Sequence, residues 1–202
     1  EFPGEVDYVP PRPIRAAPDP ADISAIAEKL LAAERPIVWA GAGVLRARAS
    51  AELVTLAELL DSPVMTTNPG KSAFPEDHPL SLGAAAGSRP LTLQRFLDDA
   101  DCVLAIGSSL TRTPFGPNLP PGKVVLHATN APDDINKDYA VDHAAIGDAK
   151  LVLEALIGAL GGMDRRDLGT AAKVAALRAE WLGDWQPHLE SDEMPMDPYR
   201  IL

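Results

Sequence analysis

Short, continuous apolar runs alternate along this chain with segments of helical periodicity, and this alternation restricts the fold more than any other feature. Five such runs occur, at residues 36–40, 63–67, 102–106, 123–127 and 143–146. Continuous rather than alternating apolarity is typical of parallel strands that are covered on both faces. Helical patterns flank the runs, at about residues 20–31, 53–60, 93–97, 152–160 and 170–183. A strand followed by a crossover helix and another strand is the repeating unit of an α/β fold. We therefore expect a Rossmann-like, doubly wound, mostly parallel sheet of five to six strands with helices on both faces.

The two ends of the chain differ from the middle. The first twenty residues contain six prolines, a composition typical of an extended linker, and prolines return near the end at Pro187, Pro195 and Pro198. Asp19 and Pro20 have the residue types of a helix N-cap and first turn. We therefore expect a linker from an upstream domain over residues 1–19 and a central Rossmann-like domain over 20–184. A second linker and the start of a downstream domain are expected over 185–202.

Loops rich in glycine or hydroxyl groups follow four of the predicted strands. They contain Gly41 and Gly43, then Thr66, then Ser108 and Ser109, then Asn130. In such sheets, ligands bind at the carboxyl ends of the strands near the point where strand order reverses. A nucleotide site is one interpretation of these loops, and structural turns are the other.

Two features weaken the nucleotide interpretation. The third glycine of the motif Gly-x-Gly-x-x-Gly is missing, because position 46 is Arg. No acidic residue ends the second predicted strand, where a dinucleotide-binding fold would hold a ribose. The 68–88 segment, rich in Pro and Gly, is expected to be a loop.

Side chains suited to catalysis are few. We expect structural hydrogen bonds for His127 and His143, and a rigid loop with local bonds around His78. The single cysteine, Cys102, heads an apolar run and is expected to be a small buried hydrophobe, which excludes a disulfide framework. The acidic pairs at 98–99 and 133–134 are expected to be solvated. No phosphate-binding P-loop, nucleophile elbow or paired metal ligand occurs in the sequence.

The formal net charge of −11 argues against nucleic acid as a partner, because phosphate binding requires clustered Lys and Arg. No apolar run approaches the length of a membrane-spanning helix, so no membrane partner is expected. With one cysteine and no visible signal peptide, we expect a cytoplasmic protein.

Five segments carry a resemblance to a known family, at residues 40–43, 63–67, 70–83, 99–107 and 147–150. Together they resemble the central domain of thiamine-diphosphate-dependent enzymes, a group that includes acetolactate synthase, benzoylformate decarboxylase and oxalyl-CoA decarboxylase. The resemblance covers about residues 20–160. Residues 194–200 resemble the entry into the family's pyrophosphate-binding domain, and the proline-rich start resembles the exit from its pyrimidine-binding domain.

The resemblance implies a parent enzyme, a homodimer or homotetramer, that makes or breaks a C–C bond next to a carbonyl with thiamine diphosphate and Mg²⁺. In the family this cofactor lies between the two flanking domains, and its metal motif, Gly-Asp-Gly followed by Asn-Asn, is absent here. The isolated chain is therefore expected to be a scaffold without catalytic residues of its own.

Some members of the family hold FAD or ADP in the central domain. By position, the residues of this chain that would face such a ligand are Gly41, Gly43, Thr66, Ser108, Ser109, Asn130 and Asp148. Two departures from those members weaken the case for FAD or ADP binding. After the central strand those members have a motif that resembles Gly-Ala-Arg, whereas this chain has Ser108 and Ser109 in place of the Ala and Arg. After the next strand they carry aspartates, whereas this chain has Thr129, Asn130 and Ala131. Arg112 could replace the missing arginine in part.

Two other functions remain open on the sequence. One is a stand-alone regulatory module that senses a nucleotide. The other is a sirtuin-like, NAD-dependent deacylase. The Gly41-Ala42-Gly43-Val44 motif fits the opening motif of that family, but its zinc module needs several cysteines and this chain has one.

Overall fold

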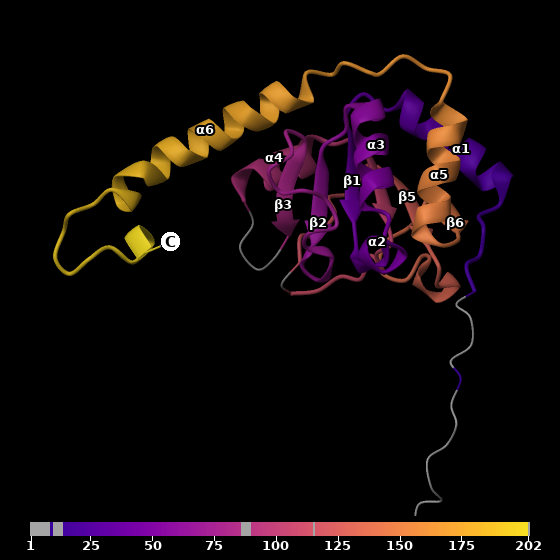
Figure 1. Ribbon diagram of the computed structural model, residues 1–202, viewed down its shortest axis with the longest axis horizontal. Coiled ribbons are helices and arrows are strands. Elements are labelled where there is room, and N and C mark those ends of the chain that lie inside the picture. Colours follow the sequence, from indigo (N-terminus) through magenta and orange to yellow (C-terminus); the bar gives the residue numbers. More distant parts are fainter. Residues whose placement is uncertain (1–8, 10–13, 86–89, 115, 202) are drawn as a thin grey trace, which may run out of the picture.

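Six parallel strands form the centre of the molecule. The computed structural model describes residues 9, 14–85, 90–114 and 116–201. The strands are β1 (Pro36–Ala40), β2 (Val64–Thr67), β3 (Ser81–Ala85), β4 (Cys102–Ile106), β5 (Val124–Thr129) and β6 (His143–Ile146). Their order in the sheet is β3-β2-β1-β4-β5-β6, and every adjacent pair is parallel. The chain runs outward from β1 to β3 and then returns to place β4 beside β1, so the strand order reverses between β1 and β4 (Figure 1).

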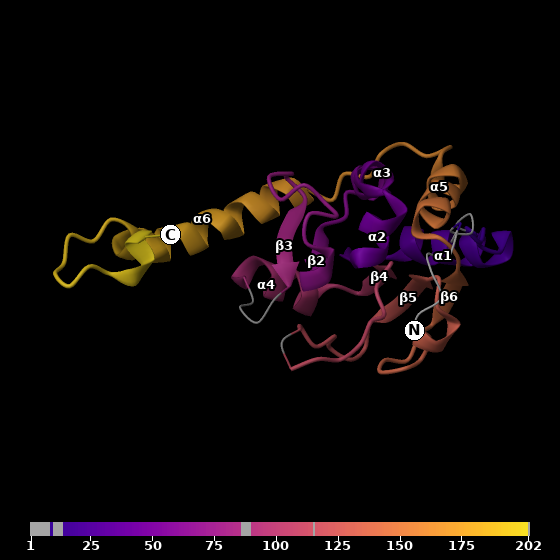
Figure 2. The same cartoon turned by 60° about the horizontal axis from the view of Figure 1, so that its bottom comes forward.

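The helices cover both faces of this sheet. The α-helices are α1 (Pro20–Ala32), α2 (Ala42–Ala47), α3 (Ser50–Leu60), α4 (Leu91–Asp99), α5 (Ala149–Leu160) and α6 (Thr170–Leu189). Short 3-10 turns follow as η1 (Asn68–Gly70), η2 (Pro132–Asp134) and η3 (Pro198–Ile201). Figure 2 shows α1, α3 and α5 gathered on one side of the sheet and the loops after β4 and β5 on the other.

Alternate residues of each strand supply two separate cores. Val38, Leu104 and Leu126 pack against α1, α3 and α5. Their neighbours Ile37, Val103 and Val125 face the opposite side, where α4 and Val174 of α6 cover them. Because successive side chains of a strand point to opposite faces, a sheet covered twice requires the continuous apolar runs of this sequence. The predicted fold class is confirmed.

Local signals set the helix ends that position the strands. Asp19 accepts a hydrogen bond from the Ala21 N–H group at 2.8 Å, which makes it the N-cap of α1, as its residue type predicted. The helix α5 ends at Leu160 beside Gly161. Helix α6 runs to Leu189, past the end near residue 183 that the sequence suggested, with Pro187 in its last turn.

Two short elements escaped the sequence prediction. Strand β3 lies inside the segment expected to be a loop, and its Gly83 and two alanines give it little of the β-branched signal of the other strands. Helix α2 begins directly after β1, within the Gly41–Gly43 loop, and spans a turn and a half. The expectation of a continuous loop over 68–88 was therefore wrong at residues 81–85.

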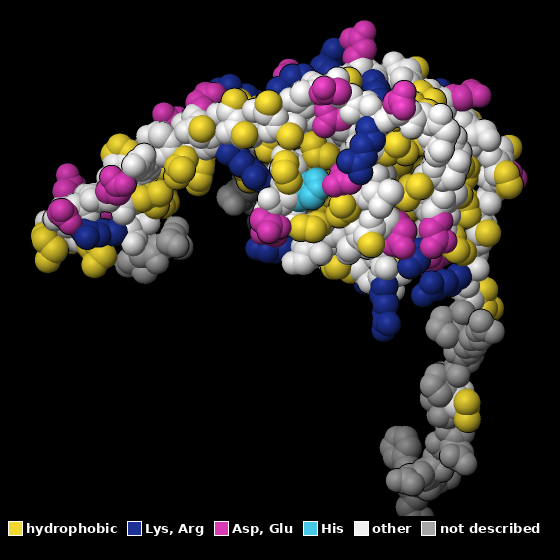
Figure 3. Space-filling view, turned by 45° about the horizontal axis from the view of Figure 1, so that its top comes forward, with side chains coloured by type: hydrophobic (Ala, Val, Ile, Leu, Met, Phe, Trp, Pro, Cys, Tyr) yellow, Lys and Arg dark blue, Asp and Glu magenta, His cyan; other side chains and the backbone are white. Residues whose placement is uncertain are grey.

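Helix α6 begins on the domain and then leaves it. Asp61 accepts hydrogen bonds from the N–H groups of Leu168 and Thr170, at 2.6 and 3.1 Å, and so fixes the start of the helix. The Arg95 guanidinium pairs with Glu180 at 2.9 Å. Beyond this point Trp181 and Leu182 are 43% and 48% exposed, and hydrophobic side chains are visible along the arm that α6 forms (Figure 3).

Candidate functional site

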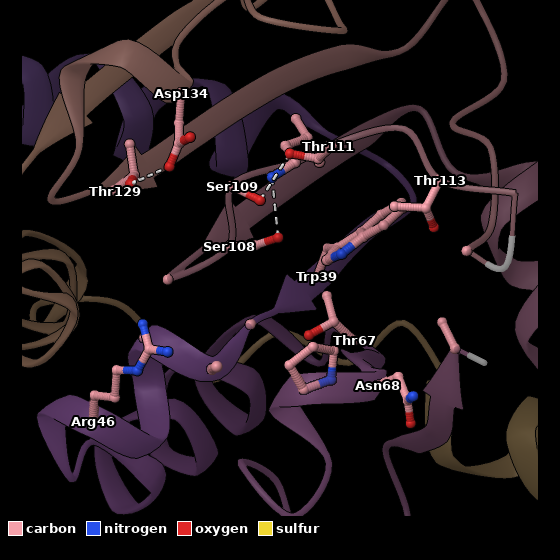
Figure 4. A pocket seen from close by; sticks show the side chains of 18 of the residues that line it. Trp39, Arg46, Thr67, Asn68, Ser108, Ser109, Thr111, Thr113, Thr129 and Asp134 are labelled. Carbon is pink, nitrogen blue, oxygen red and sulfur yellow. Dashed lines mark hydrogen bonds between the residues drawn. The ribbon is translucent and has the colours of Figure 1, made fainter.

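A cleft of about 530 Å³ opens at the carboxyl edge of the sheet, over the point where strand order reverses. Its described walls come from the loops after β1, β2, β4 and β5, as expected for a doubly wound sheet (Figure 4). A cleft of this size is in the range of small-molecule sites. Of the seven predicted site residues, those among its described lining are Gly41, Gly43, Ser108, Ser109 and Asn130.

The glycines of the cleft allow two backbone segments to touch. The Gly43 N–H group donates to the Gly107 carbonyl at 2.7 Å, and the Gly41 N–H group donates to Ile106 at 2.9 Å. A Cβ atom on Gly41 would lie 2.6 Å from the Ser108 Cα atom. These N–H groups are thus committed within the protein, so the glycines shape the cleft and do not offer free donors to a phosphate.

The loop after β4 is held from below by β5. The buried His127 Nε2–H group donates to the Ser108 carbonyl oxygen at 2.8 Å, and the Ser108 hydroxyl accepts from the Leu110 N–H group at 3.1 Å. Burial lowers the pKa of His127 and so favours the neutral ring, while the bond to the Ser108 carbonyl acts in the opposite direction and is the weaker effect. The structural role expected for His127 is confirmed.

The remaining two predicted site residues lie elsewhere. Thr66 is 3% exposed within β2 and is not among the described residues lining the cleft. Asp148 caps α5, because its carboxylate accepts from the Lys150 and Leu151 N–H groups, at 3.0 and 3.4 Å. Its own N–H group donates to Ala16, beside the N-terminal segment. A ligand contact by either residue remains an untested prediction.

Charged groups reach the cleft from positions that the sequence did not single out. Arg46 of α2 and Asp134 of η2 are the charged side chains among its described lining. The expectation that Asp134 is solvated was therefore wrong: it is half-buried, and the Thr129 hydroxyl donates to it at 3.5 Å.

Arg112 does not fill the place suggested for it. Its guanidinium lies over the Tyr139 ring, 4.9 Å from the centroid, and it is not among the described residues of the cleft. The arginine that does line the cleft is Arg46, which stands where the glycine motif lacks its third glycine.

Other predicted structural roles agree with the contacts. His143 pairs with Asp22 at 3.1 Å, and the His78 Nδ1 atom accepts from the Leu80 N–H group at 3.2 Å. Cys102 is 1% exposed, and burial raises the pKa of its thiol to about 12. None of these side chains lines the cleft in the part of the chain that the structure describes.

The residues that the structure describes do not fit the Mg²⁺ ion that accompanies thiamine diphosphate in the family. Among the described residues, no group of three or more His, Cys, Asp or Glu side chains could hold a metal ion. Asp148, in the Gly147-Asp148-Ala149 sequence, is committed to capping α5. No described helix is long and apolar enough to cross a bilayer.

The sheet order and the cleft at its reversal place this chain in the class of Rossmann-like, doubly wound α/β domains. The family model described as "thiamine pyrophosphate enzyme, central domain" matches residues 23–156. The chain belongs to this family, as its central domain.

Relatives and solved structures agree. The chain is 32% identical over its whole length to the probable acetolactate synthase large subunit of Methanocaldococcus jannaschii, of which it covers 34%. It is 37% identical to the probable 2-ketoarginine decarboxylase of Pseudomonas aeruginosa, over 84% of this chain and 30% of that one. The crystal structure of benzoylformate decarboxylase from Polynucleobacter necessarius superimposes with a TM-score of 0.65 at 26% identity, over 84% of this chain and 32% of that one.

The chain thus spans about a third of the length of the curated relatives it matches. The resemblance noted in the sequence is confirmed, and the comparisons support neither the stand-alone regulatory module nor the sirtuin-like alternative.

Proposed function

We propose that this chain is the non-catalytic central domain of an enzyme that uses thiamine diphosphate and Mg²⁺ to make or break a C–C bond next to the carbonyl of a 2-oxo acid. We also propose that its cleft binds ADP or FAD. The observation that carries the second proposal is that one cation, Arg46, and one carboxylate, Asp134, both line a cleft at the strand reversal. A phosphate group requires a cation such as Arg46, and ribose hydroxyls can donate to a carboxylate such as Asp134.

The loops after β1, β4 and β5 each have a role in this proposal. Gly41 and Gly43 let the ligand approach the backbone, while Ser108, Ser109 and Asn130 supply polar side chains along the walls. Arg46 faces the phosphates. FAD, when bound, would supply a flavin, whereas ADP would contribute binding energy alone.

The parent protein follows from the family. We propose that residues 1–19 lead in from a pyrimidine-binding domain, that 20–184 form the central domain, and that 185–202 lead to a pyrophosphate-binding domain. The match at 23–156 lies inside the proposed central domain. The exposed hydrophobic residues of α6 would pack against a flanking domain in a cytoplasmic homodimer or homotetramer.

Calorimetric titration of this chain with ADP, FAD and thiamine diphosphate plus Mg²⁺ tests the proposal. We expect micromolar binding of ADP or FAD and no heat from thiamine diphosphate. Binding of thiamine diphosphate would contradict the non-catalytic role. Absence of heat from both nucleotides at millimolar concentration would contradict the proposed site.

A further inference from the structure

Trp39 presents a buried hydrogen-bond donor without a partner at the wall of the cleft. It is the penultimate residue of β1, lines the cleft, and is only 4% exposed. Its Nε1 atom is buried and has no hydrogen-bond partner among the described residues. In Figure 4 the indole ring lies between the loop that carries Ser108 and the side chain of Thr67.

An indole N–H group can only donate, so it requires an acceptor. A buried donor without a partner destabilises the fold, and native proteins rarely leave one unsatisfied. The Thr67 and Ser108 hydroxyls, which also line the cleft, accept from the N–H groups of Gly70 and Leu110, at 3.0 and 3.1 Å, and neither accepts from the indole. The protein itself thus directs other donors to these oxygens.

The surroundings of Trp39 restrict the chemistry of the acceptor. The two charged side chains of the described lining, Arg46 and Asp134, stand apart from Trp39 on the other side of the view in Figure 4. Thr67, Asn68 and Thr113, which lie nearer to it in that view, are neutral. An anionic group would find its countercharge at Arg46, so a neutral oxygen is the acceptor that suits the surroundings of Trp39.

We propose that Trp39 is a ligand-binding residue whose indole N–H group donates to a neutral hydroxyl or carbonyl oxygen of the bound nucleotide, while the phosphates lie toward Arg46. This inference rests on the proposed nucleotide site. ADP would offer ribose hydroxyls to Trp39, and FAD would offer these together with its ribityl hydroxyls and flavin carbonyls.

Nuclear magnetic resonance of the indole N–H group tests this without altering Trp39. The other two tryptophans, Trp181 and Trp185, lie on α6 outside the described lining of the cleft, and neither is buried. In the W181F/W185F variant labelled with ¹⁵N, a single indole cross-peak therefore reports on Trp39. We expect ADP or FAD to shift this peak downfield and to slow exchange of its proton with water.

The outcomes separate this inference from the proposed site. A shift with ADP assigns the acceptor to the nucleoside, and a shift with FAD alone assigns it to the flavin part. Calorimetric heat with an unmoved peak overturns the role of Trp39 and leaves the nucleotide site standing. Neither heat nor shift overturns both.

The W39F variant provides a second test, because phenylalanine keeps an aromatic ring and removes the donor. Loss of one neutral hydrogen bond predicts binding about 3- to 10-fold weaker. W185F is the matched control and should bind as the unmodified chain does. Unchanged affinity in a folded W39F variant would overturn the inference, and the cross-peak measurement decides the matter if W39F does not fold.

Discussion

The N–H group of Gly43 donates a hydrogen bond to the carbonyl oxygen of Gly107 across 2.7 Å, and this bond ties the first turn of α2 to the loop after β4. The two glycines meet where strand order reverses. A Cβ atom on Gly43 would lie 2.6 Å from the Gly107 Cα atom, so neither position has room for a side chain. The floor of the cleft therefore depends on two glycines 64 residues apart in the sequence.

Substitution of Gly107 should be among the most destabilising changes at the cleft. Its φ is +59°, and an added Cβ would lie 2.7 Å from the Val44 nitrogen. Left-handed strain costs about 1–2 kcal/mol, and forcing two backbones apart adds roughly 1–3 kcal/mol. We expect G107A to lower the free energy of unfolding by about 3 kcal/mol in urea titration.

The matched control is Gly122, whose φ of +83° carries the same strain but which has open space around it. G122A should cost only the strain, about 1–2 kcal/mol. Equal losses in the two variants would show that the contact between Gly43 and Gly107 is unimportant.

His127 should make the fold sensitive to acid. Burial lowers its pKa in the folded chain, so below the unfolded value near 6.5 the unfolded chain binds the additional proton. Stability is then lost as the pH falls from 6.5 toward the folded pKa, by up to about 1.4 kcal/mol per pH unit. The H127Q variant keeps a donor for the Ser108 carbonyl and removes this titration.

Urea unfolding of both proteins between pH 7.5 and 5 measures the difference. The advantage of the unmodified chain over H127Q should shrink as the pH falls. Parallel pH profiles would contradict a neutral, buried imidazole.

Cys102 should not react while the chain is folded. With a thiol pKa of about 12, the thiolate fraction at pH 8 is about 10⁻⁴, and the side chain is 1% exposed. We expect an aromatic disulfide reagent at pH 8 to label Cys102 only at the rate of unfolding, and within minutes in urea. Rapid labelling of the folded chain would show that the start of β4 opens.

The sequence permitted prediction of most of the fold for a clear physical reason. A strand covered on both faces must be apolar throughout, and β1, β2, β4, β5 and β6 all lie within or beside such runs. Strand β3 was missed because Ser81, Gly83 and two alanines give it a weak apolar pattern, whereas β6, the strand at the other edge, keeps a short continuous run.

The site was predicted at the level of loops and not of side chains. Because the carboxyl ends of parallel strands share one edge of the sheet, the strand assignment alone predicts that Gly41, Ser108 and Asn130 lie close together. Arg46 reaches the cleft because α2 begins directly after β1, at the carboxyl edge of the sheet, and Trp39 because odd-numbered residues of β1 face the core that contains α4. The one available signal was an arginine and a tryptophan within seven residues of each other around the Gly41–Gly43 loop.

If the cleft binds a nucleotide through Arg46, titration of three proteins with ADP should distinguish them. The unmodified chain should bind ADP at micromolar concentration, and R46Q should bind about tenfold more weakly or worse, since a charge-assisted bond to phosphate is lost. R48Q is the matched control, because Arg48 is exposed at the end of the same helix and is not among the described residues of the cleft. Equal affinities of R46Q and R48Q, or no binding by the unmodified chain, would contradict the account.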